Sequence, residues 1–190
     1  MAETDGVRER ILAAADELFY GRGIQAVGMD QVREASGIPL KRIYAEFPSK
    51  ERLVVAVLAS RHALWEQGIA QAAEGRPDPT GRLLAIYDFL EAWFADGSFR
   101  GCGFINAFGE LGTVSPLVAE AAREHKRSFQ RYVAGLVAEA GADPELAPQL
   151  ALLAEGAQTT AAISGTTEPA RHARGAATVL IDAALRRPAA

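Results

Sequence analysis

Residues 23–53 constrain the fold more than any other part of the chain, because they place two short amphipathic segments on either side of a Ser36-Gly37-Ile38 break. The pattern predicts one helix from about Met29 to Ala35 and a second from about Leu40 to Glu46. A short turn containing glycine joins two helices at the angle of a helix-turn-helix. The second helix of such a unit can enter the major groove of DNA.

The residues around these two helices form a longer ordered pattern. It comprises Phe19-Tyr20-Gly21-Arg22-Gly23, Met29-Asp30, Val32, Gly37-Ile38, Ile43-Tyr44, Phe47, Pro48-Ser49-Lys50-Glu51 and Leu53. The pattern covers about residues 8–58 and resembles the DNA-binding region of the tetracycline-repressor (TetR) family of bacterial transcriptional regulators. The resemblance implies an all-α protein with an N-terminal three-helix helix-turn-helix domain. A long fourth helix would join it to a C-terminal helical domain for ligand binding and dimerisation, with about nine helices in all.

Apolar periodicity and breaker residues divide the rest of the chain into further helices. The first helix is predicted at about Val7–Tyr20, and Ser49 is expected to cap a long fourth helix. One apolar face of the first helix is predicted to contain Ile11, Leu12, Ala15, Leu18 and Phe19. The apolar side of that fourth helix is predicted to contain Leu53, Val57, Leu58, Leu64 and Trp65. Later helices are predicted at about residues 80–95, 101–111, 115–140 and 143–164, and from 168 to near Arg187-Pro188. We therefore expect a DNA-binding domain at residues 1–47 and an effector-binding and dimerisation domain at residues 48–190.

Composition excludes several other classes of protein. Apolar residues make up 49% of the 190 residues, which is enough for a buried core. No apolar run reaches the roughly 18 residues that a membrane span needs. The polar start MAETDGVRER lacks the apolar region of a secretory signal. Cys102 is the single cysteine, so no internal disulfide is expected, and a cytoplasmic location is predicted.

The expected DNA-binding surface lies on the second short helix. Its inward side chains should be Ile38, Ile43 and Phe47, and its exposed ones Leu40, Lys41, Arg42, Ala45 and Glu46. The formal net charge of −4 disfavours phosphate binding overall, but cations outnumber acids between Ser36 and Arg52. Lys41 and Arg42 can pair with guanine, and apolar neighbours can touch thymine methyl groups. The resemblance also assigns phosphate contacts to Tyr44 and Lys50. The predicted DNA-binding residues are Gly28, Arg33, Leu40, Lys41, Arg42, Tyr44, Ala45 and Lys50.

Three positions depart from the family pattern. Val27-Gly28 stands where members often carry Thr or Ser, so a hydroxyl contact to phosphate is lost although Gly28 can still cap the second helix. Arg33 replaces a small inward residue, and it either extends to a phosphate or pairs with an acid. Lys41-Arg42 replaces a small residue and a Ser or Thr, which adds charge at the groove. The alternative interpretation of this face is a solvated basic surface.

Aromatic side chains concentrate in the middle of the chain, which suits a cavity for a small hydrophobic ligand. For any one of these aromatics, ordinary core packing is the stronger interpretation, and His125 fits a surface or capping role better than a ligand contact. That a pocket exists at all is implied mainly by the family resemblance. The predicted ligand-binding residues are Trp65, Tyr87, Trp93, Phe94, Cys102, Phe104, Asn106, Phe108, Glu110, His125 and Phe129.

The last two helices are rich in small residues, which let helices of two subunits approach closely. Groove-reading helices need two half-sites, so a homodimer is expected, with self-packing of a monomer as the alternative. The predicted dimer-interface residues are Leu153, Gly156, Ala157, Thr160, Ala161, Val179, Leu180 and Ala183.

Signals for catalysis and cofactors are weak. The segment Gly101-Cys102-Gly103-Phe104-Ile105-Asn106 begins like a dinucleotide fingerprint but ends in Asn, and no strand precedes it. The three histidines show no metal-ligand spacing. We therefore predict no cofactor, metal or enzyme activity.

The expected function is a sequence-specific transcriptional regulator, a ligand-released repressor that binds a palindromic DNA operator and a small hydrophobic effector. The alternative is a helical small-molecule-binding protein or enzyme with a vestigial helix-turn-helix.

Overall fold

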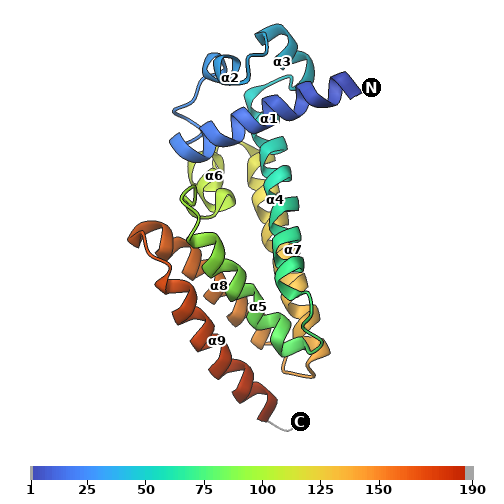
Figure 1. The fold of residues 1–190 in the computed structure, drawn as a ribbon, viewed down its shortest axis with the longest axis vertical. Coiled ribbons are helices and arrows are strands. Elements are labelled where there is room, and N and C mark those ends of the chain that lie inside the picture. Colours follow the sequence, from blue (N-terminus) through green and yellow to red (C-terminus); the bar gives the residue numbers. More distant parts are fainter. Residues whose placement is uncertain (1, 187–190) are drawn as a thin grey trace. The chain divides into compact units, whose positions relative to one another are not determined.

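The computed structural model describes residues 2–186, with side chains from residue 6 onward, and contains nine helices and no strand within that range (Figure 1). The helices are α1 (Ala2–Arg22), α2 (Met29–Ser36), α3 (Leu40–Glu46), α4 (Lys50–Ala73), α5 (Pro79–Phe94), α6 (Gly103–Leu111), α7 (Pro116–Glu139), α8 (Leu146–Ser164) and α9 (Glu168–Arg186). The all-α prediction is confirmed. The predicted end of the last helix near Arg187-Pro188 lies outside the described residues. In the part of the chain described, no helix is both long and apolar enough to cross a bilayer.

The chain forms two compact units, and each contains segments from two parts of the sequence. The first unit comprises Met1–Ala63 and Gly103–Glu124, and the second comprises Leu64–Cys102 and His125–Ala190. The division therefore falls inside α4 and inside α7. The predicted boundary after Phe47 separates the short N-terminal helices from the rest, whereas the first compact unit also contains α6.

The core of the first unit is built from the apolar face of α1. Ile11 and Ala15 are fully buried, as is Val32 of α2, because these positions recur at helical spacing and α1 packs on α2. The predicted inward positions of α3 are confirmed, since Ile43 and Phe47 are buried. Leu12 was expected on the buried face of α1 but is only half-buried.

Helix α4 begins as predicted, because Ser49 Oγ accepts the backbone N–H of Arg52 at 3.1 Å. Leu53 and Val57 are buried in the first unit, as expected. The prediction that Leu64 lies on the same apolar side is wrong, since it is 63% exposed. Beyond residue 63 the buried positions of α4 are Trp65 and Ile69, which continue the four-residue spacing of Leu53 and Val57.

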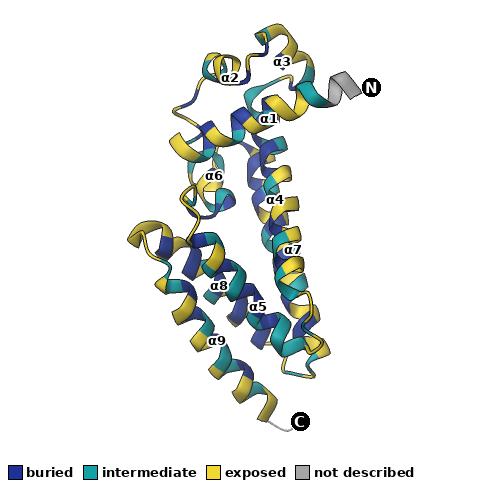
Figure 2. Cartoon of the chain, viewed as in Figure 1, coloured by how far each residue is buried: buried dark blue, intermediate teal, exposed yellow. Residues whose placement is uncertain are grey.

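The core of the second unit lies between α5, α8 and α9, which pack on one another. The inner sides of α5 and α8 are largely buried (Figure 2). Small buried residues on α8 and α9, such as Ala154 and Ala177, allow close approach, and Leu90 of α5 fills the layer between them. The buried Tyr87 hydroxyl donates to the Leu150 carbonyl at 2.8 Å, so this polar group is satisfied inside an apolar core.

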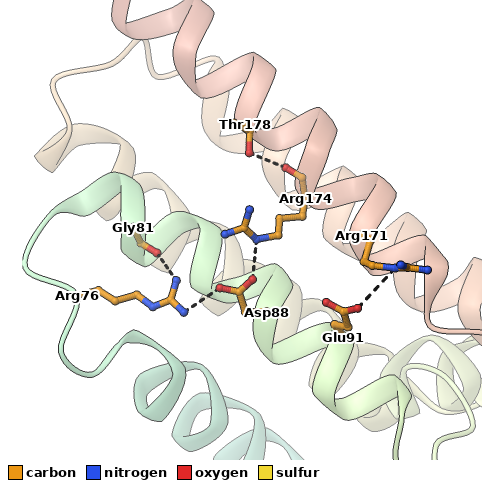
Figure 3. Close-up of polar contacts among 7 residues, drawn as sticks. All are labelled: Arg76, Gly81, Asp88, Glu91, Arg171, Arg174 and Thr178. Carbon is orange, nitrogen blue, oxygen red and sulfur yellow. Dashed lines mark hydrogen bonds and ion pairs between the residues drawn. The ribbon is translucent and has the colours of Figure 1, made fainter.

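One carboxylate connects α9 to α5 and to the loop before it. Asp88 of α5 accepts from Arg174 Nε of α9 at 2.6 Å and lies 2.8 Å from Arg76 Nη2 (Figure 3). Arg76 also donates to the carbonyl of Gly81 at 3.2 Å. A carboxylate held by two guanidinium groups forms charge-assisted hydrogen bonds that fix geometry as well as contribute energy. Asp88 therefore fixes α9 against the start of α5.

Candidate nucleic-acid interface and effector site

The turn between α2 and α3 is fixed by a glycine that the backbone requires. Gly37 has φ of 65°, in the left-handed region, and its N–H donates to the carbonyl of Arg33 at 3.0 Å. The carbonyl of Ser36 accepts Arg10 Nη2 of α1 at 2.8 Å. Because any side chain at position 37 would strain this conformation, Gly37 sets the angle at which α3 leaves α2.

Helix α3 exposes a cationic face. Lys41, Arg42 and Ala45 are exposed, and Tyr44 is 44% exposed. Arg42 forms an ion pair of 3.3 Å with Glu46, one helical turn along. The Arg42 side chain is 47% exposed, so water competes for it and its guanidinium can exchange partners. Lys41, Arg42, Tyr44 and Ala45 are thus accessible to a duplex.

Two residues of this helix differ from expectation. Leu40 and Glu46 were expected to be exposed, but both are only half-exposed. Leu40 begins the helix directly after Pro39 and Ile38, and Ile38 is buried in the small core, so the helix start is drawn toward the protein. A contact from Leu40 to a thymine methyl group would therefore involve only part of its side chain.

The start of α2 carries the two further predicted positions. Gly28 is the N-cap, with an extended backbone, and its N–H donates to the side-chain carbonyl of Gln31 at 2.7 Å. That donor is consequently engaged within the protein. Arg33 points outward and lies 3.4 Å from Asp30, which corresponds to the predicted pairing with an acid. Both side chains are well exposed, so this pair is weak.

The side chain of Lys50 points into the protein, whereas a lysine that contacts a DNA phosphate would point toward solvent. Its ammonium donates to the carbonyl of Ile24 at 2.5 Å and lies 5.8 Å from the centre of the Phe19 ring. Burial lowers the pKa of Lys50, and the carboxylate of Glu110 opposes this shift by a smaller amount. In this structure, therefore, Lys50 binds the loop between α1 and α2.

Sequence reasoning missed two arginines of α1. Arg8 is exposed, and its guanidinium lies 4.4 Å over the ring of Phe47, the residue that ends α3. Arg10 binds the carbonyl of Ser36 at the helix-turn-helix turn. The available signal was the Arg-Glu-Arg run before the apolar face of the first helix. Arg8 places a further exposed cation beside the recognition helix α3.

Aromatic rings in the second unit form one continuous cluster around Trp65. Its ring meets those of Phe89, Trp93, His125 and Phe129 edge-on, with centroid separations of 5.3–5.8 Å. These rings come from α4, α5 and α7, and Phe94 and Phe99 extend the cluster beyond Trp93.

The aromatic cluster depends on a close approach at α4. A Cβ built at Gly68 would lie 2.3 Å from Phe89 Cε2, so only glycine lets that ring lie directly against the helix backbone. Glycine at position 68 and the ring at position 89 are therefore matched in size. A larger residue at position 68 would move Phe89.

The predicted ligand-binding residues do not all belong to this cluster. Trp65, Tyr87, Trp93, Phe94, Cys102, His125 and Phe129 are in the second unit, whereas Phe104, Asn106, Phe108 and Glu110 are in the first. Asn106 is exposed and Phe108 is 46% exposed. Glu110 does not face a pocket in this structure, because its carboxylate accepts the N–H groups of Ile24 and Gln25 at 2.9 and 2.8 Å. The loop needs an acceptor at that point, and α6 supplies it.

A separate open groove of about 470 Å³ lies among the end of α4, the start of α5 and α7. The Arg82–Glu139 ion pair, with an N–O distance of 2.5 Å, joins α5 to α7 beside it. The groove shares no residue with the predicted ligand-binding set. Its lining residues are Ala70, Ala73, Glu74, Arg82, Arg131, Tyr132, Gly135, Leu136 and Glu139.

The outer faces of α8 and α9 carry exposed apolar side chains. Of the predicted interface residues, Gly156, Thr160, Val179 and Ala183 are exposed, and Leu153 and Leu180 are half-buried. Ala157 and Ala161 instead belong to the subunit's own core. Two prominent residues were missed, Leu152 at 69% and Ile163 at 83% exposure, although their spacing with Gly156 and Thr159 places them on one helical face.

Comparison with known proteins identifies the family. The description "Bacterial regulatory proteins, tetR family" matches residues 11–57, and "Tetracyclin repressor-like, C-terminal domain" matches residues 79–177. Among curated relatives, the transcriptional activator FasR of Mycolicibacterium smegmatis is 35% identical over 91 residues, which cover 46% of this chain and 42% of FasR. The transcriptional repressor NemR of Escherichia coli is 27% identical over 110 residues, 57% of this chain and 55% of NemR. These alignments span about half the length of the curated relatives.

Solved structures share the whole architecture. A putative TetR-type regulator from Streptomyces avermitilis superposes with a TM-score of 0.81 at 29% identity, covering 94% of this chain and 97% of the other. A TetR-family regulator from Streptomyces coelicolor gives a TM-score of 0.88 at 22% identity, covering 95% and 96%, which supports the fold alone. The fold, the helix-turn-helix and the matches to known proteins together define a helix-turn-helix transcriptional regulator. The chain belongs to the TetR family of bacterial regulatory proteins.

Proposed function

We propose that this TetR-family regulator is a repressor that binds a palindromic operator as a homodimer and is released by a small hydrophobic effector. The observation that carries the proposal is the exposed cationic face of α3. Lys41 and Arg42 are accessible there on a helix whose angle is set by Gly37. Guanidinium and ammonium groups on such a helix recognise guanine edges in the major groove.

The remaining predicted contacts position the protein on the DNA backbone. Tyr44 offers its exposed hydroxyl to a phosphate, and Ala45 offers a methyl group to thymine. Arg8 adds a cation beside the end of α3. Arg33 lies near the same turn, and Gly28 at the start of α2 extends the contact surface. The phosphate contacts hold the register, and Lys41, Arg42 and Ala45 select the sequence.

A second copy of the chain fits the exposed apolar faces of α8 and α9. Leu152, Ile163 and Val179 are each at least 66% exposed, and large apolar side chains clustered on one surface favour association. A dimer is required because one α3 helix reads only a half-site, and two half-sites lie roughly 34–36 Å apart along the duplex. Sedimentation analysis of Ile163→Glu should give a monomer, whereas an unchanged dimer would exclude this face.

The aromatic cluster around Trp65 is the proposed effector site. Its rings offer apolar area for a small hydrophobic molecule, and His125 offers a buried polar group. The only two tryptophans of the chain, Trp65 and Trp93, lie 5.5 Å apart in this cluster, so intrinsic fluorescence reports binding directly. A titration with candidate aromatic and aliphatic compounds should quench this emission saturably. Compounds that quench without lowering operator affinity would not be effectors.

Release from DNA is proposed to follow displacement of α4 by the bound effector. A hundredfold loss of operator affinity requires about 2.7 kcal/mol of preference for the form that cannot bind DNA. Crystals grown with and without effector would test this step through the separation of the two α3 helices. An unchanged separation would exclude it.

The decisive experiment is selection from random DNA followed by binding measurements at several salt concentrations. A regulator should enrich a two-fold symmetric sequence and bind it with a salt-dependent affinity. We propose that the protein acts by binding rather than catalysis, in the cytoplasm, where its operator would be accessible. Failure to enrich any sequence would favour the alternative, a ligand-binding protein or enzyme with a vestigial helix-turn-helix. The inward orientation of Lys50 and the absent hydroxyl at Gly28 are the observations that favour that alternative.

A further inference from the structure

One residue of the loop between α1 and α2 is held from both sides by charged groups of other helices. Glu110 of α6 accepts the N–H of Ile24 at 2.9 Å, while Lys50 of α4 donates to the carbonyl of the same residue at 2.5 Å. Glu110 also accepts the N–H of Gln25 at 2.8 Å, and the Gln25 side chain donates to the Glu110 carbonyl at 2.7 Å. All of these groups belong to the first compact unit.

This arrangement gives Lys50 a partner inside the protein when DNA is absent. Its ammonium is half-buried, and Glu110 is close enough to act on its pKa, partly compensating the effect of burial. The Ile24 carbonyl supplies only a partial charge, so the charge that balances Lys50 is the Glu110 carboxylate. A lysine side chain has four flexible carbon–carbon bonds and can reach more than one acceptor.

We propose that Glu110 restrains DNA binding by holding Lys50, which must leave the Ile24 carbonyl and the Glu110 carboxylate to reach a backbone phosphate. This inference rests on the proposed DNA-binding function, and it assigns Glu110 to the control of operator affinity instead of the effector pocket. In the free protein Lys50 occupies the inner position. In the complex it exchanges a carbonyl and a nearby carboxylate for a phosphate.

The exchange makes operator affinity depend on the position of α6. The attraction between Lys50 and Glu110 must be given up whenever Lys50 moves to a phosphate, and it weakens with separation. Helix α6 follows directly after Cys102, the last residue of the preceding segment of the second unit. Any shift of α6 toward or away from Lys50 therefore alters the affinity for DNA.

A double-mutant cycle on operator binding tests this inference. The four proteins are the wild type, Glu110→Gln, Lys50→Gln and the double variant, each measured by fluorescence anisotropy with the selected operator over a range of salt. Lys50→Gln should weaken binding and reduce the salt slope by about one, because one phosphate contact is lost. Glu110→Gln should tighten binding about two- to fivefold more in the protein that retains Lys50 than in the Lys50→Gln variant, because the two charged groups lie on the same Ile24 peptide in a partly exposed place.

The cycle separates the coupling between Lys50 and Glu110 from the effect of Glu110 on the loop. Glu110→Gln also weakens the hydrogen bonds to Ile24 and Gln25, but that effect is common to both backgrounds and cancels. Glu17→Gln is the matched control, since it removes one negative charge from an exposed position of α1 in the same unit. It should change affinity equally in the wild type and in the Lys50→Gln variant.

Two results would overturn the inference while leaving the proposed function intact. One is a Glu110→Gln effect that is identical in both backgrounds, and the other is a salt slope that Lys50→Gln leaves unchanged. If the wild type itself selects no operator, the proposed function fails first. Circular dichroism and thermal unfolding establish that each variant is folded. Should Glu110→Gln prove too disruptive, Glu110→Asp, which keeps the charge but shortens the reach, should give the same sign of coupling with a smaller size.

Discussion

The predicted functional side chains are exposed in one compact unit and buried in the other. In the unit that contains α1–α3, Lys41 and Arg42 are exposed, and the core beneath them is made of other residues. In the unit that contains α5, α8 and α9, the aromatic rings predicted to meet an effector are also the core, since Trp65 and Phe129 are buried. The proposed DNA contacts can therefore change without loss of stability, whereas the proposed effector contacts cannot.

The largest effect is expected where function and stability coincide. Trp65→Ala removes the ring that contacts four other rings of the cluster, and it should lower the free energy of unfolding by about 3–5 kcal/mol. Urea denaturation followed by circular dichroism measures the loss. Trp93→Ala is the matched control, because Trp93 is only half-buried and should cost distinctly less. Equal losses of unfolding free energy in the two variants would mean that Trp65 contributes no more to the packing of the cluster than Trp93 does.

The second prediction concerns the exposed cationic face of α3, where a loss of function should not be a loss of stability. Lys41→Ala with Arg42→Ala should weaken operator binding at least about a hundredfold, because each base contact contributes roughly 1–3 kcal/mol. The midpoint of unfolding should stay within a few degrees of the wild type, because both side chains are exposed. Anisotropy titration and thermal unfolding of the same sample give both values. A variant that loses both operator binding and stability would show that function and stability are not separate in the first unit.

A smaller effect is expected at the junction of α5 and α9. Asp88→Asn leaves Arg76 and Arg174 facing each other without a balancing charge, and it should lower the free energy of unfolding by about 1–2 kcal/mol. The estimate is modest because all three groups are about one-third exposed. Glu91→Gln, which disrupts the more exposed 3.6 Å pair with Arg171, should stay within about 0.5 kcal/mol of the wild type. Chemical denaturation should rank the two variants in this order.

The smallest effect depends on pH. Burial raises the pKa of Tyr87 above its ordinary value of 10.0, so the folded state disfavours the phenolate. The stability contributed by neutral Tyr87 is fully present below pH 10 and is lost as the pH rises beyond it. Tyr87→Phe should cost about 1 kcal/mol at pH 7 through the lost hydrogen bond to Leu150, and it should flatten the decline in stability above pH 10. Burial also raises the pKa of Tyr132, so part of the alkaline decline should persist in this variant.

The sequence was most informative where structure is local. The α3 bounds were predicted to the residue, because Gly37, Pro39 and the spacing of Ile43 and Phe47 act within a few positions. The exposure of Lys41 and Arg42 followed from the same spacing. What could not be predicted depends on distant segments: Lys50 meets a carbonyl 26 positions away, and Glu110 binds backbone 85 and 86 positions away.

The same limit applies to the C-terminal helices. Composition indicated small residues on α8 and α9, but not which of them face inward. Ala157 and Ala161 turned out to belong to the subunit's own core, while Leu152 and Ile163 lie on the surface. Alanine is compatible with either environment, so only the packing of α5 against both helices decides the outcome.

The contact between Gly68 and Phe89 has a practical consequence for anyone who wishes to change what such a regulator senses. A single methyl group at position 68 would force the Phe89 ring off the helix, and the neighbouring indoles of Trp65 and Trp93 would have to resettle around it. The shape of the proposed effector site would then change through a residue that has no side chain of its own. Altered specificity in this protein is best sought by starting from that glycine.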